Sequence, residues 1–179
     1  MTHSSHIYLS IIISQYRLRS LKIMLGGIYM EYEIVNLKQK TLVGLSARTS
    51  NDSPDMGNVI GGLWGRFYTG GVHEQIKNRV NEFAIGLYSD YTEDKKGYCI
   101  TVGNEVSNVD ENNKDLDVKI IPAGKYAKFS ICGNMVTAVA EAWQQIWEMD
   151  LDRSFTGDFE EYKNAEVENA EIDIYVALK

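Results

Sequence analysis

The chain has 179 residues, a length that suits one domain with a sizeable hydrophobic core. Its formal net charge of −7 argues against nucleic acid as a direct partner, because phosphate binding requires clustered lysine and arginine. The two cysteines, Cys99 and Cys132, form no CxxC pair and have no histidine close in sequence. We interpret both as reduced core residues and predict no disulfide scaffold, no metal site and no cofactor.

Residues 1–29 differ from the rest of the chain. Their apolar run from Ile7 to Ile13 is too short to span a bilayer. No basic residue precedes this run, and no small-x-small cleavage site follows it before Arg17, so a signal peptide is not favoured. The sequence therefore predicts a cytoplasmic protein without a membrane partner.

Two glycines just before Met30 suggest another origin for this segment. If the codons of Gly26 and Gly27 are GGA-GGA, they spell a bacterial ribosome-binding sequence at a suitable distance from Met30. We predict that Met30 is the true start and that residues 1–29 are translated leader; the alternative is a disordered N-terminal extension. On both interpretations the functional domain covers 30–179.

From Met30 onward, strand and helix signals occur in two similar sets. Apolar and β-branched stretches predict strands, and apolar residues at i, i+3, i+4 and i+7 predict helices. The first set comprises two strands, a helix and two strands, over 32–37, 41–48, 59–67, 82–88 and 98–106. The second set repeats this order over 116–121, 125–132, 136–147, 155–162 and 171–178.

This repetition predicts a tandem pair of one supersecondary unit. Strands that alternate apolar and polar residues, together with two helices on one side, give an α+β fold with a mainly antiparallel sheet. Either the other face of the sheet or the seam between the two halves is then free for a ligand.

Several short motifs occur in an order that resembles the GyrI-like effector-binding domains, which are found in AraC-type and MerR-type regulators and as stand-alone proteins. The likeness covers Met30 to Lys179. One departure is Val176-Ala177-Leu178, where the family often has Ile-Pro-Val. The matching motifs are Gly62–Phe67, Pro122–Phe129 before Gly133, Ala142-Trp143 with Trp147, Phe159–Tyr162 and Ile172–Val176.

The resemblance implies a pseudo-twofold pair of βαββ (SHS2-like) units around a central ligand groove. It also implies a buried glutamate that pairs with cationic aromatic compounds in some members, and the Phe-Glu-x-Tyr pattern assigns that role to Glu160 with Tyr162 nearby. Because side chains alternate along a strand, Glu160 and Tyr162 share one face, while Phe159 and Glu161 share the other. The alternative is that both glutamates are exposed surface carboxylates.

Aromatic residues supply the remaining candidates for the site. Those at helical spacing lie along one side of a helix, and such residues more often pack in the hydrophobic core than contact a ligand. Indole and phenol faces can, however, also attract a cation. Tyrosine suits a groove because it has an apolar body and a polar tip. The candidates are Trp64, Phe67, Trp143 and Trp147 on the helices, and Tyr68, Tyr88, Tyr126 and Tyr162, of which Tyr126 and Tyr162 are preferred.

Three functions follow from this pattern. The first is a stand-alone module that binds a small organic compound, cationic or aromatic, and sequesters or senses it. The second is a hydrolase in which Glu160 and a tyrosine such as Tyr126 act as base and acid. The third is a protein-interaction role, such as modulation of gyrase. Nothing in the chain resembles a DNA-binding segment.

Overall fold

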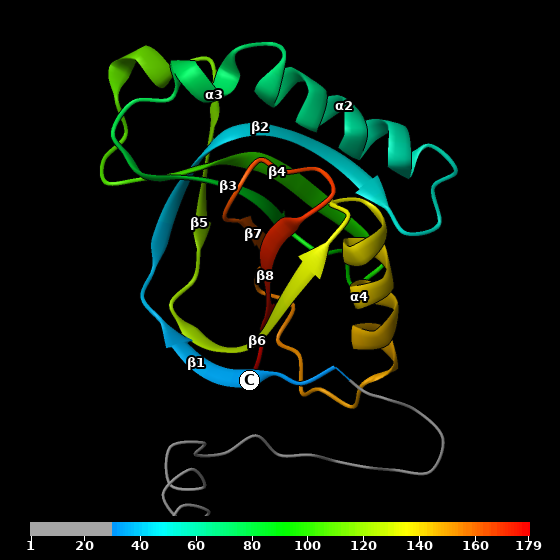
Figure 1. The fold of residues 1–179 in the computed structure, drawn as a ribbon. Coiled ribbons are helices and arrows are strands. Elements are labelled where there is room, and N and C mark those ends of the chain that lie inside the picture. Colours follow the sequence, from blue (N-terminus) through cyan, green and yellow to red (C-terminus); the bar gives the residue numbers. More distant parts are fainter. Residues whose placement is uncertain (1–29) are drawn as a thin grey trace, which may run out of the picture.

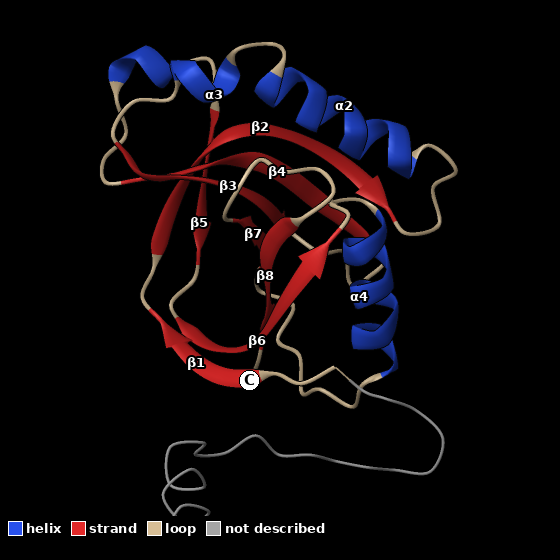
Figure 2. Ribbon diagram, viewed as in Figure 1, coloured by secondary structure: helices blue, strands red, loops and turns tan. Residues whose placement is uncertain are grey.

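The computed structural model describes residues 30–179, and the expected leader over 1–29 lies outside the described residues. One eight-stranded sheet carries the fold, with helices on one side of it (Figures 1 and 2). The elements in chain order are β1 (Glu33–Leu37), β2 (Lys40–Ser50), α2 (Met56–Tyr68), α3 (Val72–Gln75), β3 (Arg79–Ser89), β4 (Gly97–Val106), η1 (Glu111–Asn113), β5 (Asp117–Ile121), β6 (Gly124–Gly133), α4 (Thr137–Glu148), β7 (Asp158–Tyr162) and β8 (Ala170–Ala177).

The order of the strands reveals a pseudo-twofold axis at the middle of the sheet. The order is β1-β6-β8-β7-β3-β4-β2-β5, and every neighbouring pair is antiparallel. If this order is reversed and the strands β1–β4 are exchanged with β5–β8, the same order results. Each half gives its first strand to the other half, because β1 pairs with β6 and β5 pairs with β2. The predicted α+β fold with tandem βαββ units is therefore confirmed.

The two longer helices lie on the same face of the sheet but over different strands. α2 packs on β2 and β4, while α4 packs on β6 (Figure 1). Leu63 and Phe67 of α2 share one hydrophobic core with Trp143 and Ile146 of α4. The central strands β3 and β7 lie between these two helix–sheet contacts.

The opposite face of the sheet has its own buried cluster, which includes Leu42, Ile85, Tyr126 and Phe159. Side-chain alternation along β8 explains the division, since Ile172, Ile174 and Val176 contact the helix-side core while Tyr175 and Ala177 contact the second cluster. A sheet with both faces covered needs apolar residues on both faces, which this chain supplies along its central strands.

Three details differ from the sequence predictions. Cys99 is buried as expected, but Cys132 is exposed, because it lies near the end of β6 beyond the buried cluster. The strand predicted over 155–162 begins only at Asp158, since Phe155 has a left-handed backbone with φ of 56°. The short helix α3 was not predicted. Within residues 30–179, no helix is long and apolar enough to cross a membrane.

Candidate ligand-binding site

Glu160 lies at the centre of the sheet, on the face that the helices cover. It belongs to β7, where it pairs with Gly86 of β3. Phe159 packs in the cluster on the opposite face, as the predicted alternation requires. Glu160 is only 2% exposed, so the alternative of an exposed surface carboxylate does not hold for it.

Three side chains donate hydrogen bonds to the Glu160 carboxylate. Trp143 Nε1 donates to Oε1 at 2.6 Å, and the Tyr88 hydroxyl donates to the same oxygen at 2.8 Å. The Tyr162 hydroxyl donates to Oε2 at 2.8 Å. These donors come from α4, β3 and β7, so the tertiary fold assembles the cluster.

Burial and hydrogen bonding act in opposite directions on Glu160. Burial raises the pKa of this carboxyl above its usual range, while the hydrogen bonds from Trp143, Tyr162 and Tyr88 lower it, and burial is the larger effect. The pKa values of the Tyr88 and Tyr162 phenols are raised well above the usual range, by burial and by the neighbouring Glu160. Both phenols therefore remain protonated and act as donors.

Among the described residues, Glu160 differs from its neighbours on β7 in having no cationic partner. Asp158, two residues earlier on the same face of β7, forms an ion pair with Arg153 at 2.6 Å. Glu161, on the opposite face, lies 3.4 Å from Lys40 Nζ. Among residues 30–179, no lysine, arginine or histidine forms an ion pair with Glu160. A buried carboxylate without a counter-charge is costly, and a cation beside it would remove that cost.

A cavity of about 720 Å³ opens beside Glu160, between α2, α4 and the central strands. Eight of its 21 lining residues are aromatic. The two halves of the chain contribute equivalent residues, a tryptophan from each long helix and a tyrosine from each central strand. Six of the residues expected in the site line it: Trp64, Tyr88, Trp143, Trp147, Glu160 and Tyr162.

The other expected residues lie outside this cavity. Tyr126 is on the opposite face of the sheet, where its hydroxyl donates to the Pro122 carbonyl at 2.8 Å. Phe67 is fully buried in the helix-side core. Tyr68 stacks on Trp64, with ring centroids 6.0 Å apart, without lining the cavity. The proposed catalytic pair of Glu160 and Tyr126 is therefore separated by the sheet.

Sequence reasoning missed one end of the cavity. Tyr91, Lys95, Arg153 and Phe155 line it there. All four lie in the connections β3–β4 and α4–β7, outside the periodic segments, so hydrophobic periodicity gave no signal for them. Their proximity depends on the tertiary fold, because the two connections are more than fifty residues apart in the sequence.

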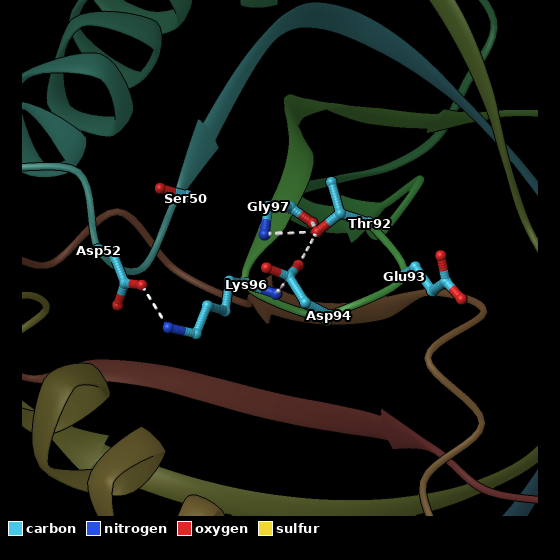
Figure 3. Close-up of a pocket in the computed structure, with 7 residues that line it drawn as sticks. All are labelled: Ser50, Asp52, Thr92, Glu93, Asp94, Lys96 and Gly97. Atoms are coloured by element: carbon cyan, nitrogen blue, oxygen red, sulfur yellow. Dashed lines mark hydrogen bonds and ion pairs between the residues drawn. The ribbon is translucent and has the colours of Figure 1, made fainter.

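A second hollow of about 640 Å³ lies at the end of β2 and the β3–β4 connection (Figure 3). Its polar groups are bonded to one another: Lys96 Nζ lies 2.6 Å from Asp52, and Asp94 accepts from Thr92. These side chains are exposed to solvent. The cavity beside Glu160 is therefore the candidate functional site. Among the described residues, no group of histidine, cysteine and acidic side chains is arranged to hold a metal ion.

Comparison with solved structures supports the fold. An integron cassette protein from Vibrio cholerae is 23% identical with a TM-score of 0.66, over 83% of this chain and 95% of that one. SAV2435, solved bound to tetraphenylphosphonium, is 21% identical with a TM-score of 0.71, over 84% of this chain and 94% of that one. A putative transcription regulation protein from Staphylococcus aureus is 22% identical with a TM-score of 0.67, over 84% and 99% of the two chains.

A search of curated proteins finds no match to this chain. Residues 33–178 match the family described as Cass2, integron-associated effector binding protein. The match spans the whole sheet and both long helices, including the cavity beside Glu160. The chain therefore belongs to the family of integron-associated effector-binding proteins.

Proposed function

We propose that this protein binds a hydrophobic organic cation in the aromatic cavity, with the positive charge next to Glu160. The single observation that carries the proposal is a buried carboxylate that has three neutral donors and, in the part of the chain that the structure describes, no cationic partner. Such a group is stabilised when a ligand supplies the missing charge in a site with little water.

The size and lining of the cavity support the same proposal. A volume of about 720 Å³ lies within the range of roughly 300–1,000 Å³ that is typical of small-molecule sites. Trp64, Tyr88 and Trp143 present aromatic rings to it, and each ring facing a cation contributes about 0.5–2 kcal/mol. Tetraphenylphosphonium, the cation bound to SAV2435, combines this charge with a large apolar surface and is a suitable probe.

Calorimetric titration with tetraphenylphosphonium tests the proposal. Glu160→Gln keeps the shape of the side chain but removes its charge, and we expect it to weaken binding at least tenfold, about 1.4 kcal/mol. Glu161→Gln is the matched control, because it removes a carboxylate from the adjacent position on the opposite face. Tetraphenylborate, an anion of the same shape, is expected not to bind.

Two outcomes would contradict the proposal. Equal affinities of the wild type and Glu160→Gln would remove Glu160 from the site. Equal binding of the cation and tetraphenylborate would show that shape alone is recognised.

The hydrolase alternative has one feature in its favour, because the Tyr88 and Tyr162 hydroxyls lie 2.8 Å from the Glu160 carboxylate. However, both phenols donate to Glu160 itself, so neither hydroxyl proton is directed at a substrate, and the three hydrogen bonds leave the carboxylate one lone pair, on Oε2. A general base needs a free lone pair directed at the water that it activates. We therefore place binding before turnover, and analysis of the bound compound for products distinguishes the two. A protein partner such as gyrase stays a prediction.

A further inference from the structure

The cavity has a second polar end, opposite in charge to Glu160. There the Arg153 guanidinium lies over the Phe155 ring, 4.4 Å from its centroid, and Lys95 Nζ lies 5.7 Å from the same centroid. Arg153, Phe155 and Lys95 line the same cavity as Glu160. Two cations and an aromatic ring therefore converge on one end of the space that a ligand would occupy.

One donor at this end has nothing to bond with. Arg153 Nε is buried and has no hydrogen-bond partner among the described residues, and it is the only such side-chain atom from a residue that lines the cavity. Asp158 does not serve it: its Oδ2 accepts from Arg153 Nη2 and the Tyr91 hydroxyl, and its Oδ1 accepts from the Ala177 amide. A buried donor without an acceptor is costly. Because Nε itself has almost no accessible surface, a ligand would meet Arg153 through the other atoms by which this residue lines the cavity.

The charges at this end leave an excess of positive charge. Arg153 is balanced by Asp158, whereas Lys95 forms no ion pair within residues 30–179. Asp158 and Glu160 are two residues apart on one face of β7, so the Cα atoms of Glu160 and of the partner of Arg153 lie about 6–7 Å apart along the strand. The cavity thus has a negative and a positive end within the length of one small molecule.

The backbone at Phe155 is strained in a way that fits a binding role. Its φ of 56° lies in the left-handed region, which bulky residues other than glycine rarely adopt. Neighbouring contacts hold it in place, since the Ser154 amide donates to the Ala177 carbonyl at 2.8 Å and Arg153 bridges to Leu178. Local strain that the surrounding fold maintains clusters at active sites, ligand clamps and switch regions.

We propose that the ligand of this site is zwitterionic. Its cationic centre lies beside Glu160, its aromatic body lies against Phe155, and its carboxylate accepts hydrogen bonds from Arg153 and faces Lys95. This inference rests on the proposed function, because it adds a second charged group to the cation proposed above. It narrows the ligand class from hydrophobic cations to aromatic compounds in which the aromatic body separates a cationic centre from a carboxylate.

A rhodamine dye in two forms tests this inference on the 179-residue chain. The free acid carries the cationic ring system and a carboxylate, and the methyl ester carries the ring system alone. Fluorescence anisotropy gives both affinities. We expect the acid to bind about tenfold more tightly than the ester, since a charge-assisted hydrogen bond contributes about this much. The protein's charge of −7 favours the ester at long range, so this preference has to come from the site.

Two substitutions locate the preference. Arg153→Gln is expected to reduce the ratio of acid affinity to ester affinity to about one, while the ester still binds. Because this change leaves the Asp158 carboxylate unpaired, the same two affinities are also measured in the double variant Arg153→Gln/Asp158→Asn. We expect the same ratio of about one in this variant. Lys95→Gln is expected to lower the ratio partly. Lys96→Gln, the adjacent lysine that pairs with Asp52 and does not line this cavity, is expected to leave it unchanged.

The outcomes separate this inference from the proposed function. If the ester binds as tightly as the acid to the wild type, or if the ratio survives in the double variant, the zwitterion inference is wrong and cation binding stands. If neither form binds and tetraphenylphosphonium does not bind either, the proposed function is wrong and the inference is overturned with it.

Discussion

Gly86 lies directly opposite Glu160 in the pairing of β3 with β7, and it leaves the space that the carboxylate occupies. A Cβ atom added to Gly86 would lie 3.3 Å from Glu160 Oε2 and 3.4 Å from Trp64 Cζ2. The pseudo-twofold axis relates these two positions, so the two halves have diverged where they meet. One half supplies the charge and the other supplies room for it, which avoids two like charges facing each other across the sheet.

Gly86→Ala should therefore disturb the site directly. The new methyl group must displace the carboxylate or Trp64 by a few tenths of an ångström. Because the site is packed tightly, we expect a loss of about 1 kcal/mol in the free energy of unfolding. We also expect a several-fold loss in tetraphenylphosphonium affinity. Urea unfolding and calorimetric titration measure the two effects.

Gly62→Ala is the control for this substitution. Gly62 lies in α2 with no atom within 4 Å of an added Cβ, and it does not line the cavity. Replacing glycine by alanine in a helix interior should raise the free energy of unfolding by about 0.5–1 kcal/mol. If both substitutions have the same effect, Gly86 has no special role in making room for Glu160.

The buried carboxyl should make stability depend on pH in an unusual direction. Because the folded-state pKa of Glu160 is raised above 4.5, the folded state holds more protons than the unfolded state between these two values. The free energy of unfolding contributed by this group is therefore greatest below pH 4.5 and falls as pH rises through the folded pKa. Glu160→Gln removes this contribution.

Urea unfolding of the wild type and of Glu160→Gln, from pH 4.5 upward, tests this dependence. The wild type should lose stability relative to the variant as pH rises. A difference in the free energy of unfolding that stays constant with pH would contradict the raised pKa.

Cation binding should show the opposite dependence on pH. Protonation neutralises Glu160, so the affinity for tetraphenylphosphonium should decrease as pH falls through the raised pKa, starting above the ordinary value of 4.5. Glu160→Gln should bind weakly and with no dependence on pH in this range. A wild-type affinity that stays constant down to pH 4.5 would show that Glu160 does not interact with the bound charge.

Trp143 should set the pH at which that affinity is lost. Its Nε1 donates to Glu160 at 2.6 Å, and this hydrogen bond favours the ionised carboxylate. Trp143→Phe keeps the aromatic wall but removes the donor, so the pKa of Glu160 should rise further. We expect the midpoint of the pH dependence to move upward by about one unit.

Trp147→Phe provides the comparison for Trp143. Trp147 lies one turn later on α4, is 55% exposed and makes no hydrogen bond to Glu160. The midpoint should stay where it is in the wild type. If the two variants move the midpoint equally, the indole donor is not the cause.

The sequence predicted what depends on local patterns. Alternation along β7 was enough to place Glu160 and Tyr162 on one face, and the two helical stripes were enough to place Trp64 and Trp143 over the sheet. The resemblance to GyrI-like domains then indicated which glutamate to consider. These features need only the periodicity of one element at a time.

The features that were missed depend on contacts between distant elements. Tyr126 was a preferred candidate for the site, but β8 lies between β6 and β7, and the register of β6 turns Tyr126 to the opposite face. No local pattern indicates that β1 and β5 pair with the other half. Arg153 is held by its bridge to Leu178 near the end of the chain, so its place in the cavity follows only from the assembled fold.

The Arg153–Asp158 pair should be costly to break but much less costly to remove. Asp158 has no exposed surface, and within residues 30–179 Arg153 is its only cationic partner, at 2.6 Å. Arg153→Gln leaves a buried carboxylate without a counter-charge, and we expect the free energy of unfolding to fall by about 3–5 kcal/mol. Asp158→Asn in the same chain removes the stranded charge and should recover most of this loss. Urea unfolding of both single variants and the double variant completes the cycle. Additive losses in the double variant would mean that the pair is not coupled, and Arg153 would then be held in the cavity by its packing on Phe155 rather than by Asp158.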